Sequence, residues 1–167
     1  MKITLTLAAF GLLTGIAVAM VAVPGIPPGF PMMKIQKTDG EWRRILTPAR
    51  FRVLREKDTE APFLNAFWNL NDEGIYRCAG CGAVLFSSKK KFISRSGWPS
   101  FWAPENEIMI QEKRDSSHDM DRTEILCARC GGHLGHVYPD GPPPTGRRYS
   151  VNSASLTFEL LEPDEEE

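Results

Sequence analysis

One stretch of the sequence decides how the rest is interpreted, and it runs Cys127-Ala128-Arg129-Cys130-Gly131-Gly132-His133-Leu134-Gly135-His136-Val137-Tyr138-Pro139-Asp140-Gly141-Pro142-Pro143-Pro144-Thr145-Gly146-Arg147-Arg148-Tyr149-Ser150-Val151-Asn152-Ser153-Ala154-Ser155-Leu156. A cysteine pair, a histidine pair, a proline-rich turn and a polar strand follow one another with almost nothing between them. Packing alone does not require such a run, because the inner faces of strands are normally apolar. The stretch therefore predicts a metal site beside a polar pocket.

The four cysteines of the chain form two CxxC pairs, Cys78 with Cys81 and Cys127 with Cys130, and a glycine follows each pair. A CxxC loop lets both thiolates point at one ion, and the glycine frees backbone N–H groups to bond the sulfurs. Disulfides or a redox CxxC are the alternatives, which an oxidising compartment would permit. We favour one structural zinc ion, since four thiolates complete a tetrahedral site and leave no open position for catalysis.

The polar strand places three different functional groups on one face. Arg148, Ser150 and Asn152 are two residues apart, and side chains two apart in a strand share a face. That face carries a cation, a hydroxyl and an amide, so we expect it to line a pocket. His133 and His136 precede it and are interpreted in three ways: as metal ligands, as structural groups bonded to backbone, or as an acid or hydrogen-bond donor near neutral pH.

An aromatic cluster surrounds Gly97-Trp98-Pro99. Trp98, Phe101 and Trp102 lie within five residues and form a rigid apolar platform. On its own this pattern is compatible with a core element or with the wall of a pocket.

The N-terminus predicts export. Lys2 is the only charge before Lys34, and Ile3–Val23 is uncharged. That run is long enough to cross a bilayer, which takes about 20 residues. It fits an uncleaved anchor or a signal peptide with small residues before a cleavage site; a buried core helix is the weaker alternative, because no polar face is present. We therefore expect a periplasmic or membrane-anchored protein that faces away from the cytoplasm. Residues 1–33 would be this segment with a proline-rich tether, 34–162 the domain and 163–167 a solvated acidic tail.

The remaining composition favours strands and turns. The formal net charge of −1 over 167 residues offers no basic surface for nucleic acid, while 14 glycines and 13 prolines separate short apolar runs. Thr47 followed by Pro48 predicts the start of a short amphipathic helix over Pro48–Lys57. Strands are expected at three places, with a charged loop over Glu112–Asp121 between the last two: Val84–Phe86, Glu107–Ile110 and Thr123–Leu126.

These motifs together resemble the methionine-R-sulfoxide reductase family, MsrB, from about Leu46 to Phe158. The shared features are both CxxC pairs, Gly-Trp-Pro-Ser-Phe at 97–101, His-Leu-Gly-His-Val at 133–137, Pro-Asp-Gly-Pro at 139–142 and Arg-Tyr-X-Val-Asn-Ser-Ala-Ser-Leu at 148–156. The resemblance implies a mainly β fold of two small antiparallel sheets, a β-tent, with short N-terminal helices and a structural zinc. It implies reduction of methionine-R-sulfoxide, free or in oxidised proteins, with a thioredoxin-like reductant.

The resemblance also implies roles for single residues. Trp98 would hold the methyl group of the substrate, Arg148 would raise the positive potential, and the sulfoxide oxygen would be surrounded by His133, His136 and Asn152. Ser150 stands where the family has its nucleophilic cysteine, and Ser96 stands where many relatives have a resolving cysteine.

A serine at position 150 predicts loss of turnover. Its hydroxyl ionises far above pH 7, and it cannot carry away the oxidation as a sulfenic acid. We therefore expect an inactive or substrate-trapping form. Three hypotheses are compatible with it: a reductase in which cysteine was exchanged for Ser150 to hold a substrate-like state, a natural non-catalytic protein that binds methionine sulfoxide, or a zinc-stapled scaffold with an unrelated interaction role.

Overall fold

The structure is a computed structural model that describes residues 33–161. The predicted acidic tail, and the predicted targeting segment except for Met33, lie outside the described residues. Across residues 33–161 neither α-helix is long and apolar enough to span a membrane.

Two short helices open the described chain, α1 (Asp39–Ile45) and α2 (Pro48–Glu56). The Thr47 side chain accepts a hydrogen bond from the backbone of residue 50 and caps α2, which confirms the predicted helix. Helix α1 was not predicted separately. Its signal is a capping box, in which Thr38 and Glu41 bond each other's backbone N–H groups.

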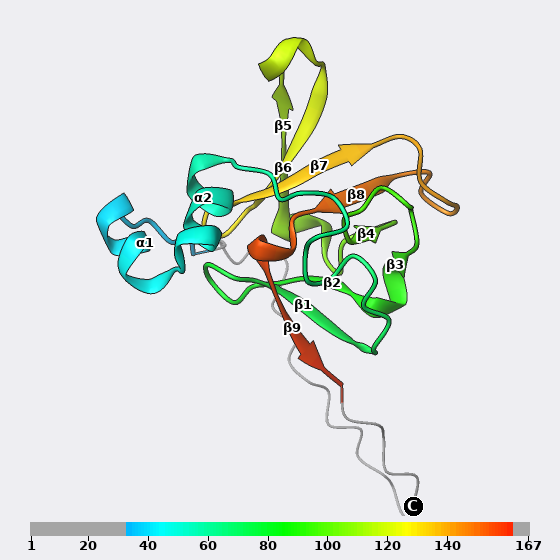
Figure 1. The fold of residues 1–167 in the computed structure, drawn as a ribbon, viewed down its shortest axis with the longest axis horizontal. Helices are drawn as coiled ribbons and strands as arrows, with labels where there is room; N and C mark the ends of the chain where they lie inside the picture. The colour runs from blue at the N-terminus through cyan, green and yellow to red at the C-terminus, as the bar shows by residue number, and fades with distance from the viewer. Residues whose placement is uncertain (1–32, 162–167) are drawn as a thin grey trace, which may run out of the picture. The chain divides into compact units, whose positions relative to one another are not determined.

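The strands form two antiparallel sheets, as predicted (Figure 1). A three-stranded sheet has the order β2-β1-β9 and a six-stranded sheet has the order β3-β4-β8-β7-β6-β5. The strand bounds are β1 (Gly74–Cys78), β2 (Val84–Ser87), β3 (Lys91–Phe92), β4 (Ser100–Phe101), β5 (Ile110–Asp115), β6 (Arg122–Cys127), β7 (His133–Tyr138), β8 (Arg148–Val151) and β9 (Leu156–Leu160). The described residues also contain short 3₁₀ turns at Ser88–Lys90, Glu107–Met109, Ser117–Asp119 and Ser153–Ser155.

One hydrophobic core joins both sheets and both helices. Phe86 of β2 stacks on Phe101 of β4 with ring centroids 4.4 Å apart, and Tyr76 of β1 meets Phe101 edge to face at 5.0 Å. Trp42 of α1 and Leu54 of α2 are also almost fully buried. Each such side chain contributes roughly 1.5–3 kcal/mol by its burial, so these contacts fix the two sheets against each other.

The prediction for the segment around β5 was wrong. Glu107–Met109 is a 3₁₀ turn, the strand starts at Ile110, and it continues through the first four residues of the expected charged loop, to Asp115. The cause is that β5 is an edge strand with its four central residues exposed, so backbone pairing with β6 maintains it without an apolar pattern. Figure 1 shows the β5–β6 hairpin projecting from the rest of the domain.

Candidate active site and cysteine cluster

The two cysteine pairs come together at the ends of two hairpins. Cys78 and Cys81 lie where β1 turns into β2, and Cys127 and Cys130 lie where β6 turns into β7. All four Sγ atoms lie within 4.8 Å of one another, and Cys78–Cys130 and Cys81–Cys127 are each 3.6 Å apart. A tetrahedron with metal–sulfur bonds of about 2.3 Å has edges of about 3.8 Å. The cluster therefore fits a tetrahedral metal that would tie one sheet to the other.

The two turns have the same local structure. The N–H of Gly82 donates to the carbonyl of Cys78, the N–H of Gly131 donates to the carbonyl of Cys127, and both bonds are 2.8 Å. The φ angles of these glycines are 73° and 69°. Side chains with a Cβ disfavour such positive values. Sulfur atoms 3.6 Å apart are too far for a disulfide bond of about 2.05 Å, so these thiols are arranged around a point rather than paired.

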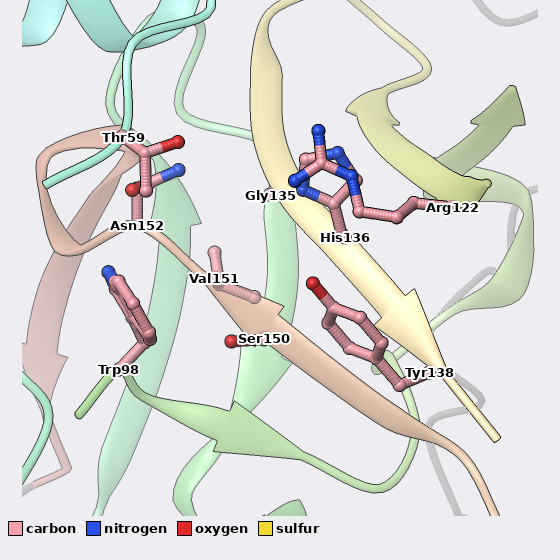
Figure 2. A pocket seen from close by; sticks show the side chains of 9 residues that line it. All are labelled: Thr59, Trp98, Arg122, Gly135, His136, Tyr138, Ser150, Val151 and Asn152. Atoms are coloured by element: carbon pink, nitrogen blue, oxygen red, sulfur yellow. The ribbon is translucent and has the colours of Figure 1, made fainter. Parts of the chain in front are cut away.

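A small pocket lies on the six-stranded sheet, beside the loop that carries Trp98 (Figure 2). Its volume is about 120 Å³. Nine residues line it: Thr59, Trp98, Arg122, Gly135, His136, Tyr138, Ser150, Val151 and Asn152. Of the residues predicted to form the site, Trp98, His136, Ser150 and Asn152 line the cavity.

Ser150 is half-buried in β8 and is paired with His136 of β7 on one side and with Ser100 of β4 on the other. Figure 2 shows it with the ring of Tyr138 on one side and the indole of Trp98 on the other. Residue 150 is therefore placed where its side chain can contact a ligand in the cavity.

The aromatic wall is fixed by the backbone of the segment before it. Trp98 donates its indole N–H to the carbonyl of Glu60 at 3.0 Å. The N–H of Glu60 in turn donates to Oδ1 of Asn152 at 3.1 Å, and Nδ2 of Asn152 donates to the carbonyl of Leu134 at 3.2 Å. The amide of Asn152 lines the cavity while both of its ends are bonded to backbone, so it holds the wall against the sheet.

His136 is held by a carboxylate from the β5 end. Its Nε2 lies 2.8 Å from Oδ2 of Asp115, and Arg122 donates to the same oxygen at 2.7 Å. Hydrogen bonds from Ser117, followed by that from His136, keep the pKa of Asp115 well below its usual range. Because Asp115 is an anion, Nε2 carries the proton and Nδ1 is the ring nitrogen available to a ligand.

His133 lies behind the pocket and not among the residues that line it. Its Nδ1 lies 2.8 Å from Glu124, and the side chains are 3% and 4% exposed. Lys57 donates to the other Glu124 oxygen at 2.8 Å. Burial lowers the pKa of His133; burial also opposes the charge on Glu124, but hydrogen bonds from Lys57 and His133 outweigh it and lower the pKa of that carboxyl. The neutral imidazole of His133 thus donates a hydrogen bond to the Glu124 carboxylate, and the positive charge of Lys57 balances the negative charge of that carboxylate.

Arg148 also stands outside the lining. It donates two parallel hydrogen bonds of 2.9 Å to the carboxylate of Asp140, and its guanidinium lies 4.4 Å from the ring centre of Tyr138. The Asp140 charge offsets the Arg148 charge, so this arginine positions Tyr138, which does line the pocket.

Ser96, the predicted resolving position, belongs to a chain of hydroxyl groups. Its Oγ lies 2.8 Å from Ser94 Oγ, which lies 2.7 Å from Ser100 Oγ. Ser100 is fully buried and pairs with Ser150 across β4 and β8. The chain connects position 96 to the strand beside position 150, although Ser96 itself is not in the lining.

The SelR domain matches this chain over residues 46–160, a range that contains every strand of both sheets. The chain belongs to this family. Peptide methionine sulfoxide reductase MsrB of Leptospira interrogans serogroup Icterohaemorrhagiae serovar Lai is 55% identical over 126 residues, which cover 75% of this chain and 96% of that protein. The MsrB protein of Thiobacillus denitrificans is 56% identical over 122 residues, which cover 73% and 92% of the two chains. That of Agrobacterium fabrum is 53% identical over 126 residues, or 75% and 93%.

Several groups around the SelR pocket were missed by reasoning from the sequence. Tyr138 follows His136 by two residues on β7, so the period of a strand could have placed it on the same face. Thr59 comes from the segment after α2 and Arg122 from β6, and their positions depend on how distant segments meet. Asp115 was assigned to a charged loop, which hid its position opposite Arg122 in the β5–β6 ladder.

Proposed function

We propose that the pocket binds the side chain of methionine-R-sulfoxide, in oxidised proteins or free. The observation that carries this proposal is the composition of the cavity. The indole of Trp98 forms one wall, the imidazole of His136 is held by Asp115, and residue 150 lies between the rings of Trp98 and Tyr138. The relatives are named peptide methionine sulfoxide reductases, which supports methionine sulfoxide as the ligand of this pocket.

The groups present suit a small polar ligand with an apolar end. An S-methyl group would pack against the face of Trp98, since an indole offers a flat apolar surface. The sulfoxide oxygen would accept a hydrogen bond from Nδ1 of His136 when the ring carries its second proton, since Nε2–H already donates to Asp115. Asn152 and Glu60 keep the indole in place, and Arg148 keeps Tyr138 in place, so the cavity is preorganised for the ligand.

Residue 150 decides whether binding leads to reaction. In the family reaction a cysteine thiolate attacks the sulfoxide sulfur, the oxygen takes up protons, methionine leaves, and a sulfenic acid stays on the enzyme until a thioredoxin-like reductant restores the thiol. Ser150 has no thiol, and all four cysteines stand in the cluster. We infer that this chain binds the sulfoxide and reduces it negligibly.

A non-catalytic binding protein is the second candidate, and the position of Ser150 favours it over a scaffold with an unrelated role. The hydroxyl lies in the cavity on an intact strand, so the exchange of sulfur for oxygen leaves a formed binding site. A natural binding protein and a reductase whose cysteine was exchanged for Ser150 would both bind the sulfoxide without reducing it. The coding sequence of the source gene separates them.

Restoring the thiol tests the proposal. Ser150→Cys should raise the rate of methionine-R-sulfoxide reduction with dithiothreitol by on the order of 10⁴-fold or more, the range lost when a nucleophile is removed from an enzyme. Ser96→Cys is the matched control, because it adds a thiol nearby but outside the pocket, and it should leave the rate at background. If the Ser150→Cys variant neither binds nor reduces the sulfoxide, the proposed function is wrong.

We also propose that the cluster holds zinc and that the protein is exported. Cys78, Cys81, Cys127 and Cys130 would be the ligands, and a metal with four thiolates would staple the β1–β2 hairpin to the β6–β7 hairpin without taking part in the reaction. The charge pattern of residues 1–33 supports a location outside the cytoplasm, and sequencing the mature N-terminus would test whether that segment is removed.

A further inference from the structure

A short apolar segment is exposed beside the pocket. It consists of Ala61, Pro62, Phe63 and Leu64, four consecutive apolar residues that are all exposed, and we call it the apolar rim. Phe63 is 48% exposed and Leu64 is 86% exposed. Isolated apolar side chains are common on protein surfaces, whereas a continuous run beside a pocket suits contact with a partner.

The rim is held in place at both ends. Before it, the carbonyl of Glu60 accepts the indole N–H of Trp98 at 3.0 Å. After it, the buried side chain of Asn65 donates to the carbonyl of Gly97 at 2.6 Å and accepts a hydrogen bond from Ser153 at 2.7 Å. The segment is therefore presented at the surface by fixed neighbours instead of being free to collapse onto the core.

Phe63 carries backbone strain while it stays exposed. Its φ is 63°. That value lies in the left-handed region, which costs a residue with a Cβ about 1–2 kcal/mol. Its N–H donates to the carbonyl of Gly97 at 2.9 Å, and its ring meets Trp68 edge to face at 5.3 Å. A strained conformation that keeps an aromatic ring at the surface suggests a functional contact.

The rim lies within reach of an extended ligand in the pocket. Thr59 lines the cavity. Phe63 is four residues further along the chain, so their Cα atoms are at most about 15 Å apart. An extended peptide advances about 3.3 Å per residue. A side chain three to five residues from the one in the cavity can therefore contact Phe63 or Leu64.

We propose that the rim binds apolar side chains that flank an oxidised methionine in an unfolded polypeptide. The occupant is an extended protein segment because the rim continues the wall of the pocket through Gly97 and Trp98, and because Ala61–Leu64 contains no charge. This inference rests on the proposed function, since it requires the sulfoxide to occupy the pocket.

Binding measured on the full chain tests it, because Ser150 leaves the ligands intact. The probes are N-acetyl-methionine-R-sulfoxide amide and two nine-residue peptides with a central methionine-R-sulfoxide, one flanked by leucines and the other by serines. The leucine peptide should bind about tenfold more tightly than the serine peptide. The double variant Phe63→Asn, Leu64→Ser should reduce that ratio to about twofold or less and leave the affinity for the amide unchanged.

Leu160→Ser is the matched control, since Leu160 is 56% exposed but lies on β9 of the other sheet. It should preserve the tenfold ratio. If the amide binds but the two peptides bind equally, or if the ratio survives in the double variant, the rim has no such role. If neither the amide nor either peptide binds, the proposed function itself fails.

Discussion

The cysteine cluster and the pocket are both attached to strand β7, yet they differ in the atom at their centre. The cluster, which ends at Cys130 just before β7, gathers four sulfur atoms within 4.8 Å of one another. The pocket, to which β7 contributes Gly135, His136 and Tyr138, has an oxygen at Ser150 where the resemblance to MsrB places sulfur. The chain thus has all four cysteines of the cluster, whereas the resemblance places a further cysteine at position 150, where this chain has serine.

This difference separates two requirements of the fold. The cluster joins two hairpins from different sheets, so removal of any one cysteine would affect the whole domain. Ser150 pairs with β4 and β7 through its backbone, and its side chain replaces one atom in an already formed cavity. The two regions should therefore differ in their response to mutation, with large effects on stability at the cluster and effects mainly on ligand chemistry at the pocket.

Disruption of the cluster is expected to have the largest effect on stability. Cys127→Ser, or extraction of the metal by a chelator, should lower the free energy of unfolding by more than about 4 kcal/mol, because the tie between the hairpins is lost. Metal analysis by mass spectrometry should find one zinc ion per unaltered chain, and denaturant unfolding gives the stability.

Ser150→Cys is the matched control for that experiment. It changes one atom of the pocket, so it should retain the metal and change the free energy of unfolding by less than about 1 kcal/mol. The comparison between the two regions breaks down if Cys127→Ser leaves the stability unchanged, or if the purified protein contains no metal.

The sequence predicted the parts of the fold that depend on neighbours along the chain. Thr47 with Pro48 marked the start of α2, and two CxxC pairs with following glycines marked a four-sulfur cluster. Trp98 was singled out by the aromatic cluster and Ser150 by the two-residue period of its strand, the resemblance added their roles, and both line the same cavity. In each case the signal lies within a few residues, so no knowledge of strand register was needed.

The groups behind the pocket could not be predicted, because they depend on register and on contacts between distant segments. Glu124 reaches His133 through the β6–β7 pairing, which contains a bulge between residues 125 and 126. Lys57 reaches Glu124 from the end of α2, where its own φ is 61°. Arg148 was expected to act on the nucleophile, and only the structure shows that Asp140 binds it.

The ion pair that supports His133 should have the next largest effect. Lys57→Met leaves the buried carboxylate of Glu124 without its cation, which should lower the free energy of unfolding by about 2 kcal/mol after allowance for the partial exposure of Lys57. Arg114→Met is the control, since Arg114 pairs with Asp121 at the exposed end of the β5–β6 hairpin and should cost less than about 1 kcal/mol. Equal losses in the two variants would contradict a special role for the buried pair.

Low pH should lower the free energy of unfolding through the buried side chain of His133. Burial lowers its pKa from 6.5, so the unfolded chain takes up a proton more readily than the folded one. Its contribution to stability is therefore present above pH 6.5 and is lost as the pH falls below that value, with a slope of up to about 1.4 kcal/mol per pH unit. Urea unfolding between pH 7.5 and 5 measures the slope. His133→Gln should flatten it, whereas the exposed His118→Gln should not; a slope that persists in His133→Gln assigns the effect to other groups.

The smallest expected effect concerns the charge near position 150. Asp140 is 59% exposed and offsets Arg148, so Asp140→Asn should change the free energy of unfolding by less than about 1 kcal/mol. It should also free the positive charge of Arg148 and thereby lower the pKa of a thiol introduced by Ser150→Cys, by about 0.5 or less. Ultraviolet absorbance of the thiolate during titration measures that pKa, with Asp121→Asn as the control at a distant exposed pair. An unchanged pKa would show that Arg148 serves only to position Tyr138. His136 would then be the group of the pocket left to influence the thiol at position 150.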